Sequence, residues 1–288
     1  MSEHGRRAYP AWLWIPAGLG ALFVLLPLIA IVVHVDWPHF GGLITSESSL
    51  AALRLSIQTA LMSTAICVVL GVPMAVVLAR GHFRGQSAAR ALVLVPLVMP
   101  PVVSGLALLY TVGSHGLLGP TLLRLGLQVP FSTTAVVLAQ SFVSLPFVVI
   151  SLEGALRTVT ETHDEIAVAY GASRTQVLFK VTLPSLGPAL ISGTVLSFAR
   201  ALGEFGATIT VAGSLQGVTR TLPLEIYLQN NLDPDAAVAL SLLLVVLALV
   251  VVFVAGRPWR RAARAELLDV ISSELRGPRG ERGNSVVS

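Results

Sequence analysis

Charge and cysteine are both scarce in this sequence of 288 residues. Only 12% of the residues are charged, whereas roughly 25% are charged in soluble domains, and 54% are hydrophobic. The one cysteine, Cys67, rules out a disulfide within the chain, and no Cys and His residues have the spacing of a zinc site. We therefore expect an integral membrane protein without a disulfide framework.

The sequence also lacks the motifs of common hydrolases. Its one lysine, Lys180, follows no glycine-rich loop, so the phosphate-binding pattern G-x-x-x-x-G-K-[ST] is absent. Neither H-E-x-x-H nor G-x-S-x-G occurs. We predict that this chain is not an enzyme, has no catalytic residue and no metal ligands, and binds no cofactor itself.

Six apolar stretches are long enough to cross a bilayer, whose hydrocarbon core takes about 20 helical residues. They cover residues 11–35, 55–78, 91–112, 133–152, 188–212 and 236–255. We expect an all-α membrane domain over 11–256, a multi-pass protein of the cell membrane. A short N-terminus (1–10) precedes it, and a basic tail (257–288) follows. Pro96, Pro100 and Pro101 should kink the third span.

Basic residues are distributed unevenly around these spans. Fifteen of the 19 lie before the first span, after the sixth, or in the second-to-third and fourth-to-fifth connections, whereas Arg54, Arg124 and Arg220 lie on the other side. Because Lys and Arg concentrate in cytoplasmic segments, both termini and the connection 153–187 should be cytoplasmic. The net charge of +4 then reflects topology, and no nucleic-acid partner is expected.

The connection 153–187 carries start and stop signals for two short helices. A T-x-x-E box begins at Thr162 and an S-x-x-Q box at Ser173, the patterns of capping boxes. Gly171 stands where a residue with positive φ ends a helix, and Pro184 should end the second helix. An ordinary cytoplasmic loop is one interpretation. Apolar faces on both helices favour the other, a surface that docks on a partner.

The same connection closely resembles the cytoplasmic loop motif of ABC importer permeases, E-A-A-x-x-x-G-x(9)-I-x-L-P. Its matched positions are Glu165, Ala167, Gly171, Leu183 and Pro184, whereas Ile166 and Val181 are conservative departures. The resemblance implies a coupling helix that docks on a separate ATPase subunit, where ATP and Mg²⁺ would bind. It assigns this ATPase-coupling role to Asp164, Glu165, Ile166, Ala167, Tyr170, Gly171, Ala172, Ser173, Leu183 and Pro184.

Two further stretches, 81–105 and 197–227, are similar to the molybdate members of that family. The second contains LGEFGAT at 202–208 and TRTLP at 219–223. Sulfate and thiosulfate permeases usually carry Glu-Tyr-Gly instead of Glu-Phe-Gly, so these residues favour molybdate or tungstate. The resemblance implies a six-span type I importer permease, which pairs with a second copy, two ATPase subunits and an extracytoplasmic solute-binding protein. A permease for sulfate, thiosulfate or another solute, and a non-transporting membrane scaffold or enzyme, are the alternatives.

Arg200 and Glu204 are the only charged residues inside the predicted spans, and they share one helix face. Arg200 lies about 18 Å along the helix from Pro188, near mid-bilayer, where ionisable groups face protein or a cavity. The two residues either form a structural pair or line an anion path, which the permanent charge of Arg would suit. Ser104, Thr208 and Thr210 carry hydroxyl groups that either line the same path or form hydrogen bonds between helices.

Thr219, Arg220 and Thr221 follow the fifth span on its outer side. An ordinary surface loop is one interpretation of this short run. The other is a contact with the extracytoplasmic binding protein or with the mouth of the path.

Overall fold

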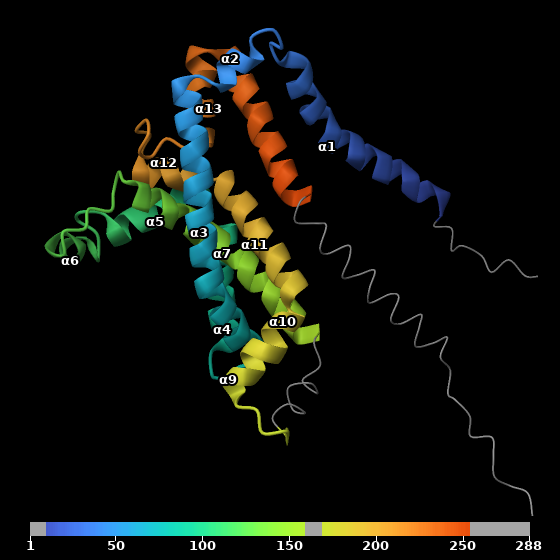
Figure 1. The fold of residues 1–288 in the computed structure, drawn as a ribbon, viewed down its shortest axis with the longest axis vertical. Coiled ribbons are helices and arrows are strands. Elements are labelled where there is room, and N and C mark those ends of the chain that lie inside the picture. The colour runs from blue at the N-terminus through green and yellow to red at the C-terminus, as the bar shows by residue number, and fades with distance from the viewer. Residues whose placement is uncertain (1–9, 159–168, 254–288) are drawn as a thin grey trace, which may run out of the picture.

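The computed structural model describes residues 10–158 and 169–253, and these residues form helices joined by loops, without a strand (Figure 1). The first half of the chain contains η1 (Ala11–Leu13), α1 (Trp14–His34), α2 (Phe40–Ile44), α3 (Glu47–Arg80), α4 (Gln86–Val98), α5 (Pro101–Val112), α6 (Gly119–Arg124) and α7 (Thr133–Thr158). The second half contains α9 (Arg174–Val177), η2 (Leu178–Thr182), α10 (Leu183–Ser185), α11 (Gly187–Leu202), α12 (Gly206–Ala212), α13 (Leu222–Leu232) and a last helix, Pro234–Phe253.

Four helices of the described chain are long and apolar enough to cross a membrane: α1, α3, α7 and Pro234–Phe253. Two pairs of helices reach that length only together, and each pair is sharply bent. The angle is 115° between α4 and α5, and 72° between Arg174–Ser185 and α11. The described chain thus has up to six candidate spans when each bent pair counts as one.

The kink predicted for the third span is confirmed, but the third and fifth spans are each divided into two helices, which the sequence analysis did not predict. The third is two helices, because Pro100 and Pro101 bring no backbone N–H to the helical ladder, and α5 restarts at Pro101. The fifth, predicted over 188–212, is interrupted after Leu202, and α12 begins at Gly206. Glycine at 203 and 206 lowers the helix propensity at this break. Hydropathy detects the apolar length of both spans but not their change of direction.

The second and fourth spans are longer than predicted. α3 begins at Glu47, eight residues before the predicted start at 55, because the Ser46 hydroxyl accepts a hydrogen bond from the Ser49 amide. α7 extends to Thr158 rather than ending at 152. Polar residues continue both helices beyond the apolar stretch.

The core of the described chain forms where α3, α7 and α11 pack together (Figure 1). Leu78, Leu152 and Leu186 are among the residues of one buried cluster at this contact. Small residues allow the close approach: a Cβ at Gly71 would lie 3.0 Å from Val148 Cγ1, and one at Gly193 would lie 3.2 Å from Val148 Cα.

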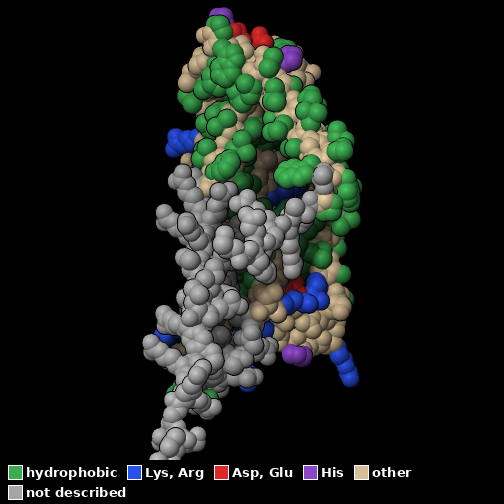
Figure 2. Space-filling model, turned by 90° about the vertical axis from the view of Figure 1, so that its right-hand side faces the viewer, with side chains coloured by type: hydrophobic (Ala, Val, Ile, Leu, Met, Phe, Trp, Pro, Cys, Tyr) green, Lys and Arg blue, Asp and Glu red, His purple; other side chains and the backbone are tan. Residues whose placement is uncertain are grey.

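The outside of the described chain is strongly apolar. No residue of α1 is buried, and this helix stands apart from the bundle (Figure 1). Hydrophobic side chains cover much of the upper part of the face in Figure 2, and several Lys and Arg side chains lie on its lower part. This distribution is typical of a surface that faces lipid and ends in a basic cytoplasmic layer.

Candidate functional site

Residues 169–186 contain several of the predicted coupling residues and are called the coupling segment below; they have the second of the two capping boxes that the sequence predicts. Ser173 Oγ accepts from the Gln176 amide at 3.3 Å, and the Ser173 amide donates to Gln176 Oε1 at 2.9 Å. Gly171 has φ +87°, the left-handed conformation that favours glycine. The second capping box and the positive φ of Gly171 are therefore confirmed, whereas the helix that Gly171 was predicted to end lies mostly outside the described residues. Thr162, and the coupling candidates Asp164, Glu165, Ile166 and Ala167, lie outside the described residues.

Pro184 does not end the second helix of this segment, contrary to the prediction. The chain continues from α9 through a π-helical turn, η2, into α10, where Pro184 lies in the first turn. Pro184 removes one backbone donor from this continuous run, directly after the π-helical turn. The change of direction comes two residues later, between Ser185 and Gly187.

The coupling segment presents an apolar surface. Tyr170 is 90% exposed and Phe179 is 63% exposed, although both are large and hydrophobic. Beside them is a hollow of about 440 Å³, which is lined by Tyr170, Gly171, Ala172, Gln176, Val177, Lys180 and Val181. Ser173 and Pro184 are exposed and Leu183 is half-buried. Exposed aromatic side chains beside a hollow are typical of a docking surface.

Arg200 and Glu204 form the ion pair that their spacing predicts, with 2.5 Å between Arg200 Nη1 and Glu204 Oε2. The other carboxylate oxygen of Glu204 accepts from the Ala207 amide at 2.8 Å. The carboxylate is therefore bonded at both ends of the break between α11 and α12. Its side chain is 1% exposed, whereas that of Arg200 is 30% exposed, so the guanidinium is the accessible partner.

The three predicted path hydroxyls lie on α5 and α12, which pack closely against each other. Ser104 and Thr208 are fully buried, and Thr210 is half-buried. Ser104 Oγ donates to the Pro100 carbonyl at 3.5 Å, and Thr210 Oγ1 donates to the Gly206 carbonyl at 2.8 Å. Both bonds stay within one helix. These two hydroxyls therefore serve the local backbone.

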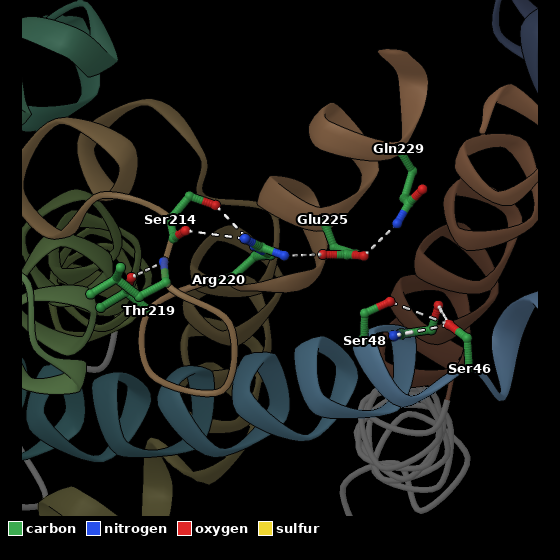
Figure 3. A network of polar contacts seen from close by, with 9 residues as sticks. Ser46, Ser48, Ser214, Thr219, Arg220, Glu225 and Gln229 are labelled. Carbon is green, nitrogen blue, oxygen red and sulfur yellow. Dashed lines mark hydrogen bonds and ion pairs between the residues drawn. The ribbon is translucent and has the colours of Figure 1, made fainter. Parts of the chain in front are cut away.

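Residues 213–221, the outer loop, connect α12 to α13, and polar contacts hold this loop (Figure 3). Arg220 reaches between Ser214 and Glu225: its Nε donates to Ser214 Oγ at 3.2 Å, and its Nη1 lies 3.4 Å from Glu225 Oε2. Gln229 Nε2 donates to the other oxygen of Glu225 at 2.8 Å. The Glu225 side chain is fully buried, so these partners compensate its charge.

Thr219 and Thr221 are buried, and the Thr219 hydroxyl accepts from the Leu215 amide at 2.8 Å. A contact between residues 219–221 and a binding protein stays a prediction. The two threonines could contribute to it only by shaping the loop. Leu215 and Val218, which are 49% and 42% exposed, form the outer surface of the loop.

Two charged groups at the ends of the bundle were missed by the sequence analysis. Glu153 of α7 binds Arg90 of α4 and Arg157 of its own helix. Glu225 pairs with Arg220. A signal for α13 exists in the sequence: Thr221 precedes a proline at the helix start and an acidic residue in the first turn. No spacing rule indicates the contact between Arg90 and Glu153, which are 63 residues apart.

Comparison with known proteins identifies the family. The family model described as "Binding-protein-dependent transport system inner membrane component" matches residues 68–257. The molybdenum transport system permease protein ModB of Mycobacterium tuberculosis is 59% identical over 247 residues, which cover 86% of this chain and 94% of the relative. The sulfate transport system permease protein CysT of Escherichia coli is 33% identical over 256 residues, which cover 86% and 92%.

Solved structures have the same fold. A bacterial ABC transporter involved in the import of the acidic polysaccharide alginate aligns with a TM-score of 0.65 at 21% identity, covering 86% of this chain and 94% of the other. An inward-facing MetNI methionine ABC transporter aligns with a TM-score of 0.58 at 19% identity, covering 75% and 99%. The all-α, type I importer permease fold predicted from the sequence is thus confirmed. The chain therefore belongs to the family of binding-protein-dependent transport system inner membrane components.

Proposed function

We propose that this chain is the permease subunit of an ATP-driven ABC importer that carries molybdate across the cytoplasmic membrane. The observation that carries the proposal is the 59% identity, over nearly the whole length of both chains, to permeases named for molybdenum transport. Tungstate, an oxyanion of the same shape and charge, would use the same path.

Transport of sulfate or thiosulfate is the second candidate function. It is supported by the 33% identity to a sulfate permease over a similar length of chain. The higher identity to the molybdenum permeases favours molybdate. Competition between labelled molybdate and unlabelled sulfate for uptake separates the two functions.

The proposed assembly contains two copies of this chain, two cytoplasmic ATPase subunits and one extracytoplasmic binding protein. ATP and Mg²⁺ would bind to the ATPase subunits. A solved alginate transporter in complex with a periplasmic protein has the same fold as this chain, which supports the arrangement. The apolar α1, which buries no residue against the rest of the described chain, is available to lipid or to the second copy.

The proposed orientation places both termini and the coupling segment in the cytoplasm. The uneven distribution of basic residues supports it. The coupling segment and the outer loop lie at opposite ends of the bundle, as α9 and α13 show in Figure 1. The coupling segment would therefore meet the ATPase, together with the preceding residues Asp164, Glu165, Ile166 and Ala167. The outer loop would face the binding protein.

We further place Arg200 on the anion path. Its guanidinium keeps a permanent charge and is the exposed member of a pair whose carboxylate is buried. Because Glu204 already neutralises this charge, a divalent oxyanion would be held weakly enough to leave again. A contact of this kind is worth about 1.5–3 kcal/mol, roughly a ten-fold or larger change in rate.

Replacement of Arg200 tests this placement. Arg200→Gln should lower molybdate uptake about ten-fold or more while the transporter still assembles. Arg124→Gln, which removes an exposed arginine from α6, is the control and should leave uptake near the wild-type value. Normal assembly together with normal uptake by Arg200→Gln would show that Arg200 does not lie on the anion path.

Uptake by intact cells tests the function itself. Cells that lack this chain should accumulate radiolabelled molybdate more slowly than their parents, and the wild-type gene should restore the rate. If removal of the chain leaves molybdate uptake unchanged at low external concentration, the proposed function is wrong.

A further inference from the structure

Three helices meet around one carboxylate at the cytoplasmic end of the bundle. Glu153 of α7 accepts from Arg90 Nε of α4 at 2.6 Å, and from Arg157 Nη2 at 3.0 Å. Arg90 Nη2 also donates to the carbonyl of Leu78, in the last turn of α3, at 3.1 Å. Gln86, at the start of α4, donates to the same carbonyl at 2.8 Å. These contacts link the ends of α3, α4 and α7.

The two arginines of this cluster differ in what they join. Arg157 lies four residues from Glu153 on α7, and its side chain is 52% exposed, so its ion pair links one helix to itself. Arg90 is 31% exposed and Glu153 is 10% exposed, and their pair joins two different helices. Exposed pairs within one helix contribute little, whereas desolvated pairs with short hydrogen bonds fix geometry.

The cluster lies near the end of α7 from which the chain continues to the coupling segment. Glu153 is in the last two turns of α7, and the connection to the coupling segment begins after Thr158. Leu152 and Leu156 of the same part of α7 pack with Leu186 in one buried cluster. This cluster connects the end of α7 to the start of α11. A displacement of the coupling segment would therefore reach the cytoplasmic end of α7.

From α4 the connection continues to the path residues. α4 joins α5 across the 115° bend, and α5 packs tightly on α12. A Cβ at Gly206 would lie 2.5 Å from Pro101 Cβ, and one at Gly105 would lie 2.5 Å from Thr210 Cβ. In the first turn of α12, the Ala207 amide donates to Glu204, which pairs with Arg200. Close packing of this kind transmits displacement rather than absorbing it.

We infer that Arg90 and Glu153 are positioning residues that couple movement of the ATPase-docking end of α7 to α4, and through α5 and α12 to the anion path. The inference rests on the proposed transport function. Without the Arg90–Glu153 pair, the coupling segment can still dock and ATP can still be hydrolysed, but α4 no longer follows α7. The defect is therefore a loss of uptake per ATP hydrolysed.

The experiment compares Arg90→Gln with Arg157→Gln. Each variant removes one arginine from the same carboxylate, and only Arg90 joins two helices. Each is assembled with its ATPase subunits and binding protein in proteoliposomes, where uptake of radiolabelled molybdate and release of phosphate are measured together. Uptake per ATP should fall about five-fold or more in Arg90→Gln, and by less than about two-fold in Arg157→Gln.

Two further variants keep the test decisive. Arg90→Lys, which retains the charge, should recover part of the ratio. Glu153→Gln, which keeps the side-chain shape, should show the same loss as Arg90→Gln, and it replaces that variant if Arg90→Gln does not assemble. A wild-type ratio in the variants that break the pair, or an equal loss in Arg157→Gln, overturns the inference. Absence of ATP-dependent uptake in the wild-type transporter would instead overturn the proposed function.

Discussion

The lack of a side chain at glycine determines how closely α5 and α12 approach. A Cβ at Gly105 would lie 2.5 Å from Thr210 Cβ and 2.8 Å from the Ala207 carbonyl oxygen, so an alanine there forces the helices apart. Gly154 of α7 has no atom within 4 Å of such a Cβ and is exposed. The two positions offer the same substitution in a crowded and in an open setting.

We predict opposite effects of alanine at these positions. Gly105→Ala should destabilise the fold by about 1–3 kcal/mol, because overpacking shifts side chains and backbone. Gly154→Ala should be neutral or stabilise by up to about 1 kcal/mol, because alanine has the higher helix propensity. Thermal unfolding of the detergent-solubilised protein measures both. Equal unfolding temperatures for the two variants would contradict the packing of α5 against α12.

At the scale of elements, the coupling segment combines a glycine turn with a capped helix. Gly171 has φ +87°, and a Cβ added there would have no atom within 4 Å. Gly85, between α3 and α4, has φ +91° and equally open space. Any L-residue strains both positions, but only Gly171 lies on the hollow of the proposed ATPase-docking surface.

Aspartate at the two glycines therefore separates backbone strain from docking. Gly171→Asp should reduce the amount of ATPase subunit that co-purifies with the chain about ten-fold, because it adds a charge to an apolar contact. Gly85→Asp carries the same backbone strain and should reduce it by less than about two-fold. The coupling assignment would fail if both variants retain the ATPase equally well.

Elements of regular apolar pattern could be predicted from the sequence, and their interruptions only in part. The lengths of the apolar stretches predict helices near α1, α3, α7 and the last helix. The prolines at 100 and 101 predict a kink, but its 115° angle depends on how α5 packs on α12. The rule that proline ends a helix gave a wrong prediction at Pro184, because the chain continues through a π-helical turn into α10, which contains this proline.

At the scale of the whole molecule, contacts between residues far apart in the chain could not be predicted from the sequence. The i, i+4 rule predicts the pair of Arg200 and Glu204. No rule of spacing predicts the contact of Arg90 with Glu153, since it arises from the packing of α4 on α7. The burial of Thr219 and Thr221 likewise depends on how the outer loop folds back on the bundle.

The central claim is that this chain provides the membrane path for molybdate in an ATP-driven importer. Its most direct test is reconstitution with the ATPase subunits and the binding protein in proteoliposomes that contain ATP. We predict accumulation of radiolabelled molybdate that requires ATP and the binding protein, that unlabelled tungstate suppresses, and that an equal concentration of sulfate leaves largely unchanged. Accumulation without ATP, no accumulation at all, or suppression by sulfate as strong as that by tungstate would contradict the claim.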